Sequence, residues 1–419
     1  MNTPARTRAL RPGHALQLMK GGEQFFPTLV AAISHARAEV LLESYIFEFA
    51  RSVIPVAQAL EAAARRGVAV RVVVDGVGSG RIPAEWAQRW RDAGVQWRVF
   101  NPAQGWRLLL PKRWRRLHRK LCVVDGEVGF CGGINLLDDY FDPNHGVLDQ
   151  PRFDFSVRVA GPLVAEMHDT MTRLWMRMQV SREARQFDAA GAFQAVIDAA
   201  RAGTDMRTEG MKGQVDRGDV NADAAAGSLA ALVLRDNVRF RSSIEGNYRL
   251  AITLAQSEIL IANAYFIPGV RLQRALLRAA ARGVRITLLL QGKYEYFMQY
   301  HASRAVYAAL LKAGIEIIEY EASFLHAKVA VMDTRGGSVA TVGSSNLDPL
   351  SLLLAREANL FIRDDAFAAE LRTHLLEAIG QGRRVEPDAH TRWPVLTRGL
   401  NWVAYAMMRT ALFVTGKRY

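Results

Sequence analysis

Cysteine is scarce in this sequence, with only Cys122 and Cys131 among 419 residues. So low a number excludes a disulfide framework. We expect two buried thiols in a reducing compartment, on paired strands joined by a turn at Asp125-Gly126. No stretch of about 18 uncharged apolar residues occurs, so no transmembrane helix is predicted. Residues 1–12 are basic and polar and lack the apolar segment of a signal peptide. These absences predict a cytoplasmic protein, either soluble or bound to a membrane surface.

Acidic residues are outnumbered: 54 Lys and Arg against 41 Asp and Glu give a net charge of +13. This excess favours an anionic partner, which could be nucleic acid, an acidic membrane surface or a phosphorylated substrate. Half of the residues are hydrophobic and only 14 are proline, which excludes a disordered chain and allows a large core. No clustered spacing of His, Cys and Asp ligands is present, so we predict neither a metal nor another cofactor.

The chain contains one pattern twice, and this repeat organises everything that follows. In each copy a helix ends and an apolar strand with an aromatic pair follows, then a second helix and strand, a third helix and strand, and finally a strand hairpin with a His-x-Lys motif. The matching segments are Ala32–Phe47 with Ala251–Phe266, Ala64–Asp75 with Ala280–Gln291, Asp92–Trp97 with Lys312–Ile317, and Leu117–Asp125 with Leu325–Asp333.

Alternating helices and apolar strands predict an α/β fold with two pseudo-symmetric halves, each a mixed β-sheet flanked by helices, and a single active site at their interface. We place the first half at residues 1–201, a flexible linker rich in Gly, Asp and Ala at 202–228, and the second half at 229–385. Residues 386–419 form a basic and aromatic tail. The first half also carries about a dozen extra residues before its motif, because Gly94 and His118 are 24 positions apart whereas Gly314 and His326 are 12 apart.

Each copy of the motif combines His, Lys and Asp with a following turn of small residues and Asn. The first set is His118, Lys120, Asp125 and Asn135, and the second is His326, Lys328, Asp333, Ser344 and Asn346. At strand spacing the histidine and lysine point to the same side of one strand. A single His-x-Lys motif is usually structural, but recurrence of the whole set at equivalent points of two similar halves favours a catalytic site.

These residue types suit attack on an anionic phosphodiester. Lysine neutralises the non-bridging oxygens, histidine attacks phosphorus, and Asn135, Asn346 and Ser344 can donate hydrogen bonds to the phosphate. The histidine of the other half then acts as general acid for the leaving oxygen and as base for the incoming hydroxyl. Asp154 and Glu357, each on the strand after a motif, are the expected carboxylates that orient the histidines. The aspartates of the motifs, counted here with the catalytic set, are expected to cap the hairpin turns.

The two motifs resemble the paired HKD motifs of the phospholipase D superfamily, over about His14 to Arg383. More narrowly, the chain is similar to bacterial cardiolipin synthases of the short B-type form. The segments that carry this likeness are Leu42–Phe47, Gly132–Asn135, Asn263–Pro268 and Gly343–Asp348. The resemblance implies a ping-pong transfer through a covalent phosphohistidine. A phosphatidyl group passes from phosphatidylglycerol to a second phosphatidylglycerol, with His118 as nucleophile and no cofactor.

A lipid substrate implies peripheral contact with the cytoplasmic face of the cell membrane, and two segments could provide it. Trp106, Arg107 and Trp114, in the extra stretch before His118, are expected at the substrate rim together with Tyr45 and Tyr265. The tail from 399 to 415 suits a helix lying in the membrane interface, although it could equally pack on the core.

Three other functions stay open from the sequence. A nuclease of the same superfamily would use the same chemistry and the positive charge, but the apolar Trp and Leu residues beside the site and the apolar tail oppose it, and we expect no nucleic acid partner. A catalytically silent membrane-binding protein is opposed by the intact His, Lys and Asn of both motifs. Simple hydrolysis to phosphatidic acid differs only in the acceptor. Nothing in the sequence indicates an oligomeric state.

Overall fold

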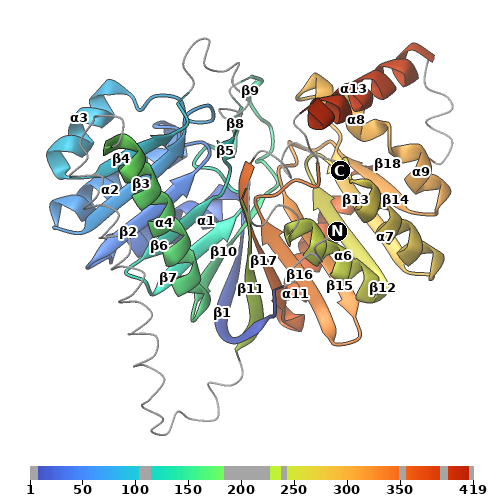
Figure 1. Ribbon diagram of the computed structural model, residues 1–419, viewed down its shortest axis with the longest axis horizontal. Helices are drawn as coiled ribbons and strands as arrows, with labels where there is room; N and C mark the ends of the chain where they lie inside the picture. Colours follow the sequence, from blue (N-terminus) through green and yellow to red (C-terminus); the bar gives the residue numbers. More distant parts are fainter. Residues whose placement is uncertain are drawn as a thin grey trace, which may run out of the picture.

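The computed structural model describes residues 8–102, 115–142, 144–183, 227–236, 243–348, 355–386 and 395–414. Trp106, Arg107 and Trp114 lie outside these ranges, as does the predicted linker except for its last two residues. Two half-sheets with helices on their faces make up the molecule (Figure 1), so the predicted α/β class is confirmed.

Strands and helices alternate in the first half, which is blue to green in Figure 1. Apart from a single 3₁₀ turn at Arg51–Val53, its elements are β1 (Arg11–Lys20), α1 (Gly21–Ser34), β2 (Glu39–Ser44), α2 (Ile54–Arg65), β3 (Ala69–Asp75), α3 (Ala84–Ala93), β4 (Gln96–Phe100), β5 (Arg116–Leu117), β6 (Leu121–Val124), β7 (Val128–Gly132), β8 (Phe141–Asp142), β9 (Gly146–Val147), β10 (Phe155–Ala160) and α4 (Leu163–Glu183).

The second half repeats this order from yellow to red. Its elements are β11 (Ser228–Arg235), α6 (Ser243–Leu254), β12 (Ala255–Asn263), α7 (Val270–Ala281), β13 (Arg285–Gln291), α8 (Phe297–Arg304), α9 (Tyr307–Lys312), β14 (Glu316–Tyr320), β15 (Lys328–Thr334), β16 (Gly337–Gly343), β17 (Ala355–Arg363), α11 (Asp365–Gly380), β18 (Arg383–Arg384) and α13 (Val395–Val414).

The strand order shows the pseudo-symmetry directly. From the centre outwards the first half runs β1-β10-β7-β6-β2-β3-β4, and the second runs β11-β17-β16-β15-β12-β13-β14-β18. β1 and β11 pair antiparallel and join the halves into one sheet. Cys131 on β7 lies 4.0 Å from the carbonyl of Ala358 on β17, although three strands separate them in the order. The sheet therefore folds back on itself at β1 and β11.

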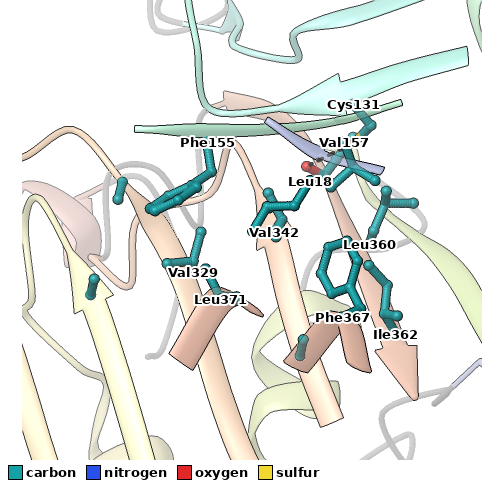
Figure 2. Packing of buried hydrophobic residues seen from close by; sticks show 14 of the residues in the cluster. Leu18, Cys131, Phe155, Val157, Val329, Val342, Leu360, Ile362, Phe367 and Leu371 are labelled. Atoms are coloured by element: carbon teal, nitrogen blue, oxygen red, sulfur yellow. Dashed lines mark hydrogen bonds between the residues drawn. The ribbon is translucent and has the colours of Figure 1, made fainter. Parts of the chain in front are cut away.

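The folded-back sheet has three main hydrophobic cores, two on its outer faces and one between its inner faces. α1, α2 and α3 cover the outer face of the first half, and α6, α7 and α9 cover that of the second. The inner faces share one core, closed by α4 and α11, in which Phe155 and Val157 of the first half face Val342 and Leu360 of the second (Figure 2). This shared core fixes the position of one half on the other.

Both cysteines are buried free thiols, as predicted. They sit on the neighbouring strands β6 and β7, but Cys122 pairs with Phe130 and Cys131 with Leu121. Their side chains therefore enter different cores on opposite faces of the sheet.

Strand β1 was not anticipated by the sequence pattern. It is buried at only three of its ten positions, so its apolar alternation is weak. Helix α4 (Leu163–Glu183) follows β10 directly.

Candidate active site

His118 follows directly after the short strand β5, which pairs with β17 of the other half. Its backbone N–H donates to the carbonyl of Arg356 at 3.0 Å. Its Nδ1 lies 3.0 Å from Oε2 of Glu357 and 3.1 Å from the carbonyl of Ser344. Glu357 is fully buried and also accepts a hydrogen bond from the Ser344 hydroxyl at 2.5 Å. These contacts hold the imidazole by Nδ1, so Nε2 is the nitrogen that can face a substrate.

His326 has the same arrangement with the roles of the halves exchanged. Its backbone N–H donates to the carbonyl of Phe153 at 3.0 Å, and its Nδ1 lies 2.6 Å from Oδ2 of Asp154. The other oxygen of Asp154 accepts from the backbone N–H of Phe155 at 2.8 Å. Each histidine is thus held by a carboxylate from the opposite half. The two carboxylates had been predicted from the sequence, but this crossing had not.

The two lysines lie beside the histidines and are buried. Lys120 Nζ donates to the carbonyl of His118 at 2.9 Å, and Lys328 Nζ donates to the carbonyl of His326. Burial lowers the pKa of Lys120 to about 7 and that of Lys328 to about 8. His118 and Lys120 precede strand β6, and only Lys328 of the second motif is in a regular strand. The expectation that each pair sits on one strand therefore needs correction, because the chain is irregular where it crosses between the halves.

Burial also lowers the pKa of both imidazoles. For His118, the carboxylate of Glu357 opposes this effect in part. The pKa of His326 falls well below its usual value because of burial and then because of the charges of Lys328 and Lys120. Burial raises the pKa of Asp154 to about 7, so the His326–Asp154 pair can hold a proton at neutral pH.

The small-residue turns after the two motifs contribute Asn135, Asn346 and Ser344 to the site. Asn135 and Asn346 are buried, and the side-chain carbonyl of Asn135 accepts from the Ile46 N–H at 3.4 Å, which leaves its amide group to donate elsewhere. Ser344 was expected to donate to the phosphate, but its hydroxyl proton goes to Glu357, so the residue positions that carboxylate instead. Gly133 occupies the equivalent place in the first half, where an added Cβ would lie 2.2 Å from Oδ1 of Asp154.

The aspartates of the motifs lie at the far ends of their strands. Asp125, in the turn after β6, accepts hydrogen bonds from the backbone of Arg37, Ala38 and Glu39. Asp333, near the end of β15, accepts from Ser257 and Ser338 and pairs with Arg372. This geometry gives them the expected bracing role and no contact with the reacting groups.

Of the two tyrosines predicted at the rim, Tyr45 lies beside the first histidine. The ring of Tyr45 lies 4.8 Å from that of His118, and Lys120 Nζ lies 5.4 Å from the same Tyr45 ring. The hydroxyl of Tyr265 donates to Glu295, a half-buried carboxylate that the sequence analysis missed because no motif surrounds it.

Arg152 was missed for the same reason. It pairs with Asp142 at 2.6 Å, and its charge contributes to the lowered pKa of His326. Within the described ranges, no group of three or more His, Cys, Asp or Glu side chains could hold a metal ion. None of the described helices has both the length and the apolarity to cross a membrane.

Known proteins match the chain over both halves. The model of the family "Cardiolipin synthase, PLD-like domain" matches residues 29–151 and 248–379. Cardiolipin synthase B of Shigella flexneri is 35% identical over 87% of this chain and 80% of its own length. The Escherichia coli K12 protein of the same name is 34% identical with the same coverage.

Solved structures agree at the level of the fold. The crystal structure of phosphatidylserine synthase from Haemophilus influenzae has a TM-score of 0.64 at 12% identity and covers 97% of this chain and 96% of its own. A polyphosphate kinase from Porphyromonas gingivalis has a TM-score of 0.54 at 16% identity, covering 95% of this chain and 53% of its own. With both motifs, the crossed histidine–carboxylate pairs and these relatives, the chain belongs to the family of cardiolipin synthases of the phospholipase D type.

Proposed function

We propose that this protein is a phosphatidyltransferase that makes cardiolipin from two molecules of phosphatidylglycerol through a phosphatidyl-histidine intermediate. The observation that carries the proposal is the pair of crossed contacts, His118 with Glu357 and His326 with Asp154, each beside a buried lysine. Two oriented imidazoles on opposite sides of one phosphate provide a nucleophile and a general acid. The curated relatives named cardiolipin synthase support the choice of a lipid reaction.

His118 is the proposed nucleophile. Its lowered pKa keeps the imidazole neutral near pH 7, and the Nδ1 contacts with Glu357 and the Ser344 carbonyl direct the lone pair of Nε2 outward. In the first step Nε2 attacks phosphorus, and the bond from phosphorus to the glycerol oxygen breaks.

His326 is the proposed general acid. Asp154, with a pKa of about 7, can hold a proton that it donates to Nδ1 of His326, so that the hydrogen of the neutral imidazole stays on Nε2. As Nε2 gives this hydrogen to the leaving glycerol, the proton of Asp154 moves to Nδ1. In the second step the unprotonated Nε2 takes the proton from the acceptor hydroxyl. The acceptor oxygen then attacks phosphorus as the bond from phosphorus to His118 breaks, and the enzyme returns to its initial state.

Lys120, Lys328 and the side-chain amides of Asn135 and Asn346 are the proposed partners of the non-bridging oxygens. Both lysines are buried among the histidines and their carboxylates, where a charge is screened less than in water. The negative phosphate would restore the full charge of these ammonium groups, and their attraction would strengthen as charge builds in the transition state.

Helix α13 is the proposed contact with the cytoplasmic face of the membrane. One side of it packs on α8, with Asn401 2.6 Å from His301 and Ala404 and Met408 buried. The other side exposes Leu396, Trp402, Val403 and Met407, with Trp402 62% exposed. The two readings of the tail are therefore compatible, because one face anchors the helix and the other is available to a bilayer. Tyr296, next to the exposed Phe297 of α8, packs on Tyr265, which links this surface to the site.

The decisive experiment is a product analysis. Purified protein is incubated with phosphatidylglycerol vesicles and the lipids are resolved by mass spectrometry, with His118→Ala and His326→Ala as controls. We expect cardiolipin and free glycerol from the wild type and neither from the variants. Phosphatidic acid alone would make the protein a hydrolase, and turnover of DNA without lipid turnover would make it a nuclease. Either result would overturn the proposal.

A further inference from the structure

A second cleft, of about 640 Å³, lies on the other side of the strands that carry the catalytic groups. It runs between α4 and β11, and we call it the arginine cleft because seven arginines line it. These are Arg8, Arg11, Arg119, Arg173, Arg177, Arg235 and Arg356. Arg119 stands between His118 and Lys120 in the chain, and Arg356 precedes Glu357. Arg119 and Arg356 line this cleft whereas His118, Lys120 and Glu357 do not, so the catalytic groups and these arginines face different spaces.

The charges in the arginine cleft are only partly balanced. Glu166 pairs with Arg8 and Arg11, and Asp169 pairs with Arg173 at 2.8 Å. At the deep end Arg119, only 4% exposed, pairs with Glu43 at 2.9 Å. The Nε–H groups of Arg119 and Arg356 are buried and have no hydrogen-bond partner among the described residues. Burial and the charge of Arg119 lower the pKa of Arg356 to about 10, as expected where cations are crowded.

The fold itself does not require these charges, as the pseudo-symmetric half shows. Arg119 corresponds to Ala327 within the second motif, and Glu43 on β2 corresponds to Ala262 on β12. Leu117 pairs with Arg356, and its counterpart Leu325 pairs with Phe153. Arg119, Glu43 and Arg356 around the first motif thus stand where the second motif is surrounded by Ala327, Ala262 and Phe153, all three buried in the shared core. Glu43 interacts with both Arg119 and Arg356, so two guanidinium groups share this buried carboxylate. Such cations are costly when they are only partly balanced, so their presence around one motif alone points to a ligand.

We propose that the arginine cleft is a second phosphate-binding site, separate from the catalytic one, that takes the phosphate group of an anionic glycerophospholipid. The forked N–H groups of arginine match phosphate oxygens. Leu163, Leu174 and Leu234 also line the cleft, which is much larger than a phosphate ion needs. A phosphate joined to apolar chains fits this mixed lining. The choice of a lipid as its source rests on the proposed function.

Binding in the arginine cleft is linked to the catalytic site through one residue. The side chain of Arg356 lines the cleft, while its carbonyl accepts the hydrogen bond from the His118 N–H at 3.0 Å. An anion that holds this guanidinium therefore also restrains the strand that positions His118 and Glu357.

The test counts bound lipids in the full chain by native mass spectrometry. The parent protein carries His326→Ala to stop turnover, and the probe is dihexanoyl-phosphatidylglycerol below its micelle concentration. Adding Arg177→Gln and Arg356→Gln is expected to remove one bound lipid per chain. Adding Arg278→Gln, which removes an exposed arginine of α7 far from the cleft, is expected to remove none. Equal lipid counts in all three proteins would overturn the proposal.

Three further measurements support the interpretation of this result. Arg177→Gln alone changes an exposed side chain and leaves the core intact. This single substitution should weaken lipid binding in the arginine cleft by about tenfold, as expected for one charged hydrogen bond. Competition by inorganic phosphate as effective as that by the lipid would overturn the lipid assignment and identify a free-phosphate site. Cardiolipin formation by the wild type is measured in parallel, so its absence would reject the proposed function separately from the lipid count.

Discussion

The two halves of the molecule keep the same catalytic groups but differ in what surrounds them. Both place a histidine, a lysine and an asparagine at equivalent points and lend a carboxylate to the other half. The first half supplies Asp154 next to Gly133, whereas the second supplies Glu357 next to Ser344. The hydroxyl of Ser344 donates a hydrogen bond to Glu357. The catalytic groups around the phosphate are therefore symmetric. The residues that surround these groups distinguish the proposed nucleophile from the proposed general acid.

The largest expected effect comes from breaking the symmetry at the histidines. His118→Ala and His326→Ala should each lower cardiolipin formation by about 10³-fold or more. They should differ with a phosphatidyl ester of p-nitrophenol, whose leaving group needs no general acid. His326→Ala should then release a burst of nitrophenolate and His118→Ala none, as followed by stopped-flow absorbance. The opposite pattern would make His326 the nucleophile.

Removing one carboxylate should cost less. Asp154→Asn and Glu357→Gln should each lower kcat by about 10²-fold, because the imidazole loses the partner that fixes its orientation. Asp154→Asn should be the more harmful for phosphatidylglycerol and nearly neutral for the nitrophenyl ester, since it removes the proton store of the acid. Equal losses on both substrates would show that Asp154 only orients His326.

The pH dependence of kcat/KM should test the protonation states assigned to the groups of the two halves. Activity should fall as pH rises through about 7 to 8, because Asp154, with a pKa of about 7, gives up the shared proton and Lys120 and Lys328 lose charge with pKa values of about 7 and 8. On the acid side, activity should persist below the usual histidine pKa of 6.5, because burial lowers the pKa of His118. A profile flat from pH 6 to 9 would contradict these assignments.

A smaller effect is expected from making the turns alike. Gly133→Ser introduces the residue found at position 344, but its Cβ would meet Asp154, so we expect a loss of about 1–3 kcal/mol in the free energy of unfolding. Ser344→Gly removes a hydrogen bond without a clash and should cost about 1 kcal/mol. Urea unfolding of the three proteins measures both, and a Gly133→Ser protein as stable as the wild type would show that Asp154 can move aside.

The smallest effect concerns α13, which has no counterpart among the described residues of the first half. Trp402→Ser with Val403→Ser should weaken sedimentation with anionic vesicles several-fold while leaving hydrolysis of a soluble phosphodiester unchanged. Leu376→Ser, at an exposed position of α11, is the matched control and should bind as the wild type does. If the α13 variant lost vesicle binding and phosphodiester hydrolysis equally, the exposed face would have a packing role.

Much of this arrangement could be predicted from the repeat alone. The duplicated pattern predicts two α/β halves, and the equivalent positions of the motifs predict that His118 and His326 face one site. The apolar segments after each motif also identify Asp154, directly before β10, and Glu357 within β17, because a buried carboxylate in such a segment needs a partner.

Other features depend on how the sheet folds back, which no local pattern contains. The crossing of the carboxylates follows from the contact of β5 with β17 and of Phe153 with Leu325, between segments more than 150 residues apart. The sequence places Arg119 between two catalytic residues but does not reveal that its side chain enters a second cleft. Glu295 stands in no motif and is found only through its contact with Tyr265.

The exchange of carboxylates between the halves also has an evolutionary consequence. A protein with a single half would have a histidine without its carboxylate, and would regain the pair only by associating with a second copy of itself. In such a homodimer every substitution appears at both places at once. Fusion of the two copies into one chain releases that constraint, so an arginine can be acquired behind one histidine while an alanine remains behind the other.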